Sequence, residues 1–205
     1  MADKLVILVE GTGDREFLYH LLNHHGFTRN YLVKPKEGIS NVLGVLGTEL
    51  KASDLQSLGL IVDADIDLAA RWASLQAVLL DSGYANVPTQ PDRDGTIVEE
   101  HGHPRVGIWL MPDNELPGVL EDFARLLVPT GDALWEQAAR CIDGIDPAER
   151  LFPNQYLIKA QIHTWLAWQE EPGTQLGLAI TRRYLDPESP VAQRFVEWVR
   201  RLFRD

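Results

Sequence analysis

Cysteine, long apolar runs and positive charge are all scarce in this chain of 205 residues. The one cysteine, Cys141, excludes an internal disulfide framework and suits a reducing compartment. No run approaches the roughly 18 apolar residues that a membrane span needs. The apolar stretch near the start, Leu5–Val9, is too short for a secretory signal and leads directly into Glu10. We therefore expect a cytoplasmic protein with no membrane partner.

Basic residues are outnumbered, with 19 Lys and Arg against 30 Asp and Glu, which gives a formal net charge of −11. Lys and Arg supply most of the non-specific affinity of proteins for nucleic acid. An acidic chain that binds a polyanion therefore needs bound cations, a local basic patch or a partner, and a second copy of the chain is one such partner.

The first part of the chain alternates between strand-like and helix-like segments. The apolar patterns predict strands at 4–9, 31–33, 58–62 and 106–111, and helices at 14–25, 39–50, 68–80 and 117–127. A turn-rich stretch contains a further short strand-like segment at 96–99. This alternation predicts an α/β fold with a mainly parallel, four-stranded sheet flanked by helices.

The end of the chain changes character. Helical patterns at 132–142, 154–169 and 190–204 are separated by prolines. The sequence thus predicts an α/β domain over residues 1–128 and a helical C-terminal appendage over 129–205 that packs on it.

Carboxylates follow the apolar strands, at the edge where open parallel sheets bind their ligands. Glu10 ends the first strand, and no capping rule places a glutamate there. Asp14, four residues on, has two interpretations of equal weight: a metal ligand, or an acid that complements the dipole of the helix it begins.

Asp63 and Asp65 follow the third strand and point to the same side of an extended chain. Two like charges held together are unfavourable unless a cation neutralises them. Asp113 and Glu115 repeat this spacing after the fourth strand, and we rank them above Glu121 as candidates. Oxygen ligands of this kind suit hard divalent cations.

A phosphate-binding loop and a zinc site are less well supported by the residues. Gly11 and Gly13 resemble the start of a phosphate-binding loop, but Glu16 takes the place of its third glycine. His20 and His24 lie one helical turn apart without the pattern of a zinc enzyme, so the histidines are expected at the surface or at helix ends.

Lys159 lies in an otherwise apolar helical segment, 156–162. It is either a surface lysine whose stem packs on the protein, or a lysine brought over the carboxylates to stabilise phosphate charge.

Together these residues resemble the toprim domain of topoisomerases, bacterial primases and nucleases. The family pattern, a Glu after the first strand and Asp-x-Asp after the third, matches Glu10 and Asp63-Ala64-Asp65. The segment Val9–Phe17, with the form Val-Glu-Gly-x-x-Asp-x-x-Phe, is closer to the "overcoming lysogenisation defect" nucleases. The segment Trp109–Gly118 resembles a group of small bacterial toprim-like proteins of uncharacterised function. The resemblance implies a Rossmann-like toprim fold.

The resemblance also implies an activity, that of a nuclease dependent on Mg²⁺ or Mn²⁺. One ion would activate water and a second would stabilise the leaving oxygen of a phosphodiester. DNA is favoured over RNA as the substrate. The chain has no Walker A motif, so the expectation is either cleavage by the chain itself or cleavage controlled by a separate ATPase chain as partner, in defence or repair. The alternative is a non-catalytic toprim-like module that regulates or binds other proteins. The implied metal ligands are Glu10, Asp14, Asp63 and Asp65, with Asp113 and Glu115 at a second position, and the implied catalytic residues are Glu10, Asp63, Asp65 and Lys159.

Overall fold

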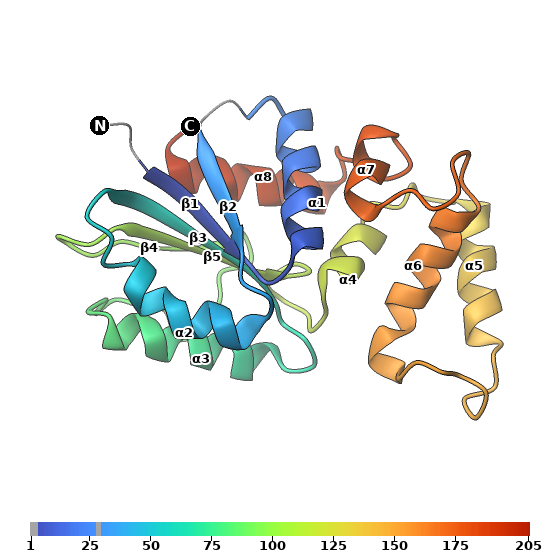
Figure 1. Cartoon of the computed structure of the whole chain (residues 1–205), viewed down its shortest axis with the longest axis horizontal. Coiled ribbons are helices and arrows are strands. Elements are labelled where there is room, and N and C mark those ends of the chain that lie inside the picture. Colours follow the sequence, from blue (N-terminus) through green and yellow to red (C-terminus); the bar gives the residue numbers. More distant parts are fainter. Residues whose placement is uncertain (1–3, 28–29) are drawn as a thin grey trace.

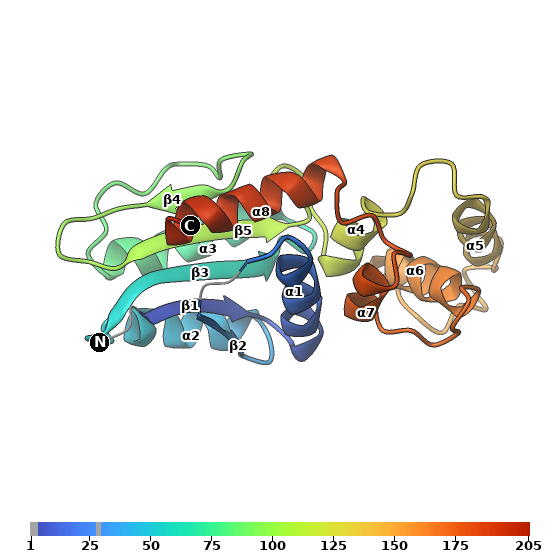
Figure 2. The same cartoon turned by 90° about the horizontal axis from the view of Figure 1, so that it is seen from above.

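The computed structural model describes residues 4–27 and 30–205 as a central β-sheet between two layers of helices (Figure 1). A further group of helices lies beyond one end of the sheet (Figure 2). The expected α/β class, with a mainly parallel sheet flanked by helices, is confirmed.

The sheet has five strands, not the four that the sequence predicted, in the order β2-β1-β3-β5-β4. The first three and the fifth run parallel, and β4 is antiparallel to β5. The fifth strand is β4, which lies in the strand-like segment 96–99. The predicted sheet did not include this segment, because so short a strand shows no clear periodicity. The bounds are β1 (Lys4–Val9), β2 (Tyr31–Pro35), β3 (Leu55–Asp63), β4 (Thr96–Val98) and β5 (Arg105–Met111).

Both faces of the sheet are buried, which explains the continuous apolar runs of its central strands. Successive side chains alternate between the faces, so Ile7 and Val9 join one core while Val6 and Leu8 join the other. The first face is covered by α1 (Thr12–His24) and α8 (Pro190–Phe203), and the second by α2 (Ile39–Glu49) and α3 (Leu68–Asp81) (Figure 1).

Helix α8 comes from the expected appendage but lies on the sheet. Its Phe195 and Trp198 are fully buried, and the Phe195 ring packs edge-on against Trp109 of β5 at 5.1 Å. The last helix of the chain is therefore part of the central core. The proposed division of the chain at residue 128 stays a prediction.

The remaining helices gather beyond the carboxyl ends of the parallel strands (Figure 2). Helix α7 packs on α1 so closely that a side chain at Gly177 would lie 2.9 Å from the carbonyl carbon of Glu16. The sequence did not predict α7, and α4 is shorter than expected. No helix in the described ranges is long and apolar enough to cross a membrane. These elements are α4 (Leu120–Arg125), α5 (Ala133–Asp143), the 3₁₀ helix η1 (Asn154–Tyr156), α6 (Leu157–Ala167) and α7 (Leu176–Thr181).

The contact between α8 and the sheet requires a glycine in β5. A Cβ atom at Gly107 would lie 2.7 Å from Leu202 Cδ2 and 3.0 Å from Trp198 Cζ2. Overpacking of a dense core typically destabilises a protein. We expect Gly107→Ala to lower the free energy of unfolding by about 1–3 kcal/mol, measured by chemical denaturation.

Gly44, in the middle of α2, is the matched control for this substitution. A Cβ atom there meets nothing within 4 Å, and its backbone is helical. We expect Gly44→Ala to stabilise the protein by about 0.4–1 kcal/mol. Equal effects of the two substitutions would contradict the close packing of α8 on β5.

Candidate metal centre

The carboxyl ends of β1 and β3 bring their acids together. These strands are parallel neighbours with Val9 opposite Ile61, so the residues that follow each strand meet. Glu10 Oε1 accepts a hydrogen bond from the amide N–H of Asp63 at 2.9 Å. Burial raises the pKa of Glu10, and this hydrogen bond and the charge of Arg71 oppose the rise.

Asp63 lies at the centre of the arrangement. Its Oδ1 accepts a hydrogen bond from the N–H of Leu120, the first residue of α4, at 3.0 Å. Burial, followed by the charges of Asp14 and Glu10, raises the pKa of Asp63 to about 8. The carboxyl group is therefore protonated over most of the neutral range when no cation is bound.

Asp14 performs the structural role that the sequence allowed and also faces the other acids. Its Oδ2 accepts a hydrogen bond from the N–H of Gly11 at 2.9 Å, which caps α1. Burial raises its pKa, and so does the charge of Glu121, while Lys159 lowers it. A helix cap and a place in the acidic site are compatible for this residue.

Asp65 is more exposed and is held by an arginine that the sequence did not assign to the site. Arg71 forms an ion pair with Asp65 and donates from Nε to the carbonyl oxygen of Asp63 at 2.8 Å. Asp65 has a left-handed backbone, with φ of 53°, and its N–H donates to Gly118 O at 2.9 Å. Asp67 has a different role, because its Oδ1 caps α3 by accepting a hydrogen bond from the N–H of Ala70 at 2.9 Å.

Lys159 pairs with Glu121 beside the other acids, and its expected catalytic role stays a prediction. Its Nζ is 2.8 Å from Glu121 Oε1, and this hydrogen bond is the main reason that the pKa of Lys159 is raised. The charge of Asp63 acts in the same direction. The Glu121 side chain is only 12% exposed, whereas that of Lys159 is 53% exposed.

Glu121, which the sequence ranked below Asp113 and Glu115, lies close to the other acids. It comes from α4, and its charge raises the pKa of both Asp14 and Asp63. Acids are common in a first helical turn, so the sequence pattern gives no signal that separates Glu121 from an ordinary surface acid. The hydrogen bonds from Leu120 N–H to Asp63 Oδ1 and from Asp65 N–H to Gly118 O hold this turn against the site.

Asp113 and Glu115 form a turn after β5. Asp113 Oδ1 accepts hydrogen bonds from the N–H groups of Glu115 and Leu116, at 3.0 and 2.9 Å. Glu115 Oε2 pairs with Arg93 Nε at 3.1 Å. Neither acid is among the main influences on the pKa of Asp14 or Asp63. Their expected role at a second metal position stays a prediction.

We call the five residues Glu10, Asp14, Asp63, Asp65 and Glu121 the acidic cluster. Within residues 4–27 and 30–205, no three carboxylate oxygens of this cluster lie within 4.8 Å of one another. Like charges repel, and backbone N–H groups hold three of the five carboxylates in place. An ion would therefore require the side chains to rotate inward.

The comparisons with known proteins were informative at the level of the family. A family model described as "Protein of unknown function (DUF3226)" matches residues 4–204. The chain belongs to this family. Comparisons with curated proteins and with solved structures gave no match. The DUF3226 match runs from β1 to α8 and so covers the acidic cluster together with the helices around it.

This member of the DUF3226 family also has a hollow of about 1130 Å³ at the amino ends of the strands. Its lining includes Leu5, Leu55, His101 and Arg105, and none of the acidic cluster. Ligand sites of open parallel sheets lie at the opposite, carboxyl edge. We therefore place the candidate site at the acidic cluster.

Proposed function

We propose that the acidic cluster binds Mg²⁺ or Mn²⁺ and that the protein hydrolyses phosphodiester bonds in nucleic acid. The observation that carries the proposal is the convergence of Glu10, Asp14 and Asp63 at one edge of the sheet, in a largely buried setting. Burying several carboxylates side by side opposes folding. A bound divalent cation removes that penalty.

The excess of negative charge in the acidic cluster supports the binding of a cation. Five carboxylates face two contacting cations, Arg71 with Asp65 and Lys159 with Glu121. Burial is the largest cause of the raised pKa of Asp63, and the charges of the neighbouring acids add to it. Carboxylate oxygens are the donors that Mg²⁺ and Mn²⁺ take.

A toprim-type fold is part of the proposal. In support, the acids follow β1 and β3, which are adjacent parallel strands at the centre of the sheet. This placement matches the toprim pattern of a Glu after the first strand and Asp-x-Asp after the third.

Each residue has a proposed role in the hydrolysis. Glu10, Asp63 and Asp65 hold the metal, with Asp14 and Glu121 beside them. Bound there, the metal supplies an activated water and offsets negative charge on the phosphate. Lys159, with its half-exposed ammonium group, stabilises phosphate charge. Arg71 fixes the backbone of Asp63 and the side chain of Asp65.

The proposed substrate is DNA, and the net charge of −11 makes its affinity depend on the metal and on a partner. A separate ATPase chain is the partner that the missing Walker A motif suggests. The wide spacing of the acidic oxygens favours a second candidate function, a toprim-like regulatory module that does not cleave nucleic acid.

Cleavage assays separate these two functions. The purified chain is incubated with plasmid DNA, single-stranded DNA and single-stranded RNA, each with Mg²⁺, Mn²⁺ or EDTA. We expect cleavage of DNA with Mn²⁺ or Mg²⁺ and none with EDTA. A protein that binds Mn²⁺ but cleaves none of these substrates would instead be the regulatory module.

Lys159 allows a test of phosphate stabilisation apart from metal binding. We expect Lys159→Gln to lower kcat about 10–100-fold, because a charge that acts on the transition state is lost, with little change in Mn²⁺ affinity. Lys51→Gln is the control, since Lys51 is an exposed lysine beside the hollow at the amino edge. Equal rates for the two variants would remove Lys159 from the mechanism.

A further inference from the structure

We propose a second metal site, for Zn²⁺ or a similar transition-metal ion, formed by His24, His25 and Glu188. The site lies at the C-terminal end of α1, whereas the acidic cluster lies at the N-terminal end. Ten residues of helix separate Asp14 from His24, which is about 15 Å. The proposal is therefore independent of the proposed hydrolytic function.

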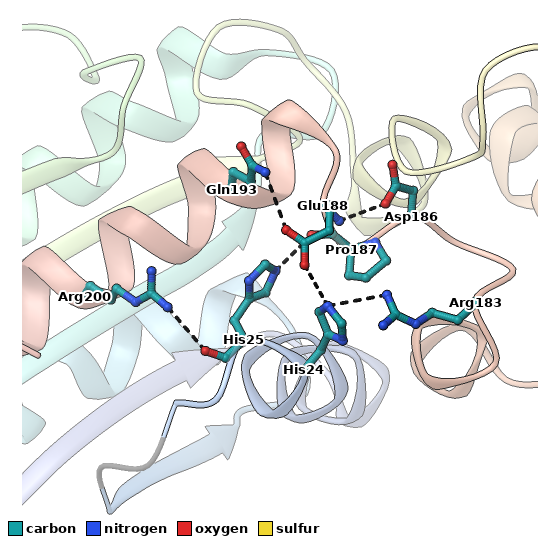
Figure 3. Close-up of polar contacts among 8 residues, drawn as sticks. All are labelled: His24, His25, Arg183, Asp186, Pro187, Glu188, Gln193 and Arg200. Carbon is teal, nitrogen blue, oxygen red and sulfur yellow. Dashed lines mark hydrogen bonds and ion pairs between the residues drawn. The ribbon is translucent and has the colours of Figure 1, made fainter.

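The three side chains already point to one place (Figure 3). A ring nitrogen of each histidine and a carboxylate oxygen of Glu188 all lie within 4.8 Å of one another. His24 Nε2 is 2.8 Å from Glu188 Oε1. A tetrahedral zinc ion with bonds of about 2.0–2.1 Å sets its ligands about 3.4 Å apart, which small side-chain rotations supply here.

The backbone around the site is held on both sides. The segment before α8 is anchored where the N–H of Asp186 donates to Leu127 O at 2.6 Å. The N–H of Glu188 donates to Asp186 Oδ1 at 2.9 Å, which fixes the turn (Figure 3). On the other side, Arg200 of α8 donates to the carbonyl oxygen of His25 at 3.2 Å.

The donor set selects the metal. Two imidazole nitrogens and one carboxylate are a set that zinc takes, with a fourth position left for water. Mg²⁺ prefers oxygen ligands only and keeps most of its waters, so it does not compete well here. The sequence pattern could not show this set, because 164 positions separate His24 from Glu188.

The hydrogen bond between His24 Nε2 and Glu188 Oε1 has to open when an ion binds, and two further contacts adjoin the ligand atoms. Arg183 Nη1 lies 3.5 Å from His24 Nε2, but its side chain is exposed and can swing outward. His25 Nε2 bonds to Pro187 O at 2.9 Å, and this oxygen either stays as a neighbour of the ring or gives way to the metal.

A metal at this place would tie the end of α1 to the segment that leads into α8. An ion that binds the folded chain and not the unfolded chain stabilises the fold. Since α1 and α8 cover the same face of the sheet, the ion would clamp the two helices of that layer together.

The test is Zn²⁺ binding by isothermal titration calorimetry on untagged full-length protein, with millimolar Mg²⁺ present to compete at the acidic cluster. We expect one Zn²⁺ per chain at the site and a rise in the thermal midpoint. Co²⁺ in place of Zn²⁺ should give the visible absorption that is typical of four-coordinate Co²⁺. Acidification should weaken binding, because a protonated imidazole cannot ligate.

Variants assign the binding to these side chains. We expect His24→Gln and Glu188→Gln each to weaken Zn²⁺ binding by about tenfold or more. His20→Gln is the matched control, because His20 lies one turn earlier on α1 and bonds to Thr181 Oγ1 at 2.8 Å. Circular dichroism of the metal-free variants establishes that they fold.

Three outcomes would overturn the proposal: no Zn²⁺ bound at 100-fold excess, wild-type binding by both His24→Gln and Glu188→Gln, or loss of binding in Asp63→Asn. The last outcome would assign the Zn²⁺ to the acidic cluster. Unchanged cleavage activity in Glu188→Gln is expected, so failure of this site and failure of the proposed hydrolase are distinguishable.

Discussion

Asp63→Asn is expected to lower the rate of phosphodiester cleavage by about 10³-fold or more while the fold stays intact. Asp63 lies between Glu10 and α4, and its carboxylate is the central donor of the proposed metal site. Asparagine keeps one oxygen but loses the negative charge that offsets the cation. The measurement is the single-turnover cleavage rate with saturating Mn²⁺, together with Mn²⁺ affinity by calorimetry.

The fold should tolerate this change, because the asparagine oxygen can still accept the hydrogen bond from Leu120. Asp67→Asn is the matched control: this acid is four residues away, caps α3 through Ala70 and lies outside the acidic cluster. Asparagine is an equally good helix cap, so activity and stability should both stay at the wild-type level. Cleavage at the wild-type rate by Asp63→Asn would refute the proposed metal centre.

The sequence predicted the central sheet well, because its physical signals are local. A strand buried on both faces has to be continuously apolar, as 4–9 and 58–62 are, and the edge where such strands end has to meet solvent or a ligand. This rule alone made Glu10, Asp63 and Asp65 candidate site residues. Their convergence then follows from the pairing of β1 with β3.

The parts that the sequence missed depend on contacts between distant segments. Glu121 enters the acidic cluster because α4 begins on the Asp63 carboxylate, 57 positions earlier in the chain. Helix α7 is stabilised by its packing on α1 and not by a periodic pattern of its own, whereas the short strand β4 lies within the strand-like segment 96–99. The sequence placed helix α8 in the C-terminal appendage, because an amphipathic pattern does not show which surface a helix covers.

A second large effect is expected in the pH dependence of stability without added metal. Between pH 5.5 and 7.5 we expect the free energy of unfolding to fall by about 2.5 kcal/mol on account of Asp63. A shift of that size lowers the thermal midpoint of a chain of this length by about 5–10 °C. The measurement is a thermal melt in EDTA at each pH.

The sign follows from the direction of the pKa shift. The pKa of Asp63 is near 3.8 in the unfolded chain and about 8 in the folded protein. Between these values the folded state holds a proton that the unfolded state has lost, so stability decreases as the pH rises. The raised pKa values of Glu10 and Asp14 act in the same direction.

Asp63→Asn and added Mn²⁺ isolate the contribution of this one carboxyl group. The variant has no proton to lose at this position, so its thermal midpoint should vary less with pH and exceed that of the wild type at pH 7.5. Excess Mn²⁺ should raise the wild-type midpoint more at pH 7.5 than at pH 5.5, because the ion binds the ionised carboxylate and displaces the proton. Parallel pH profiles for wild type and variant, unaffected by Mn²⁺, would mean that Asp63 is ionised without a metal and that its charge is already balanced by Arg71 and Lys159.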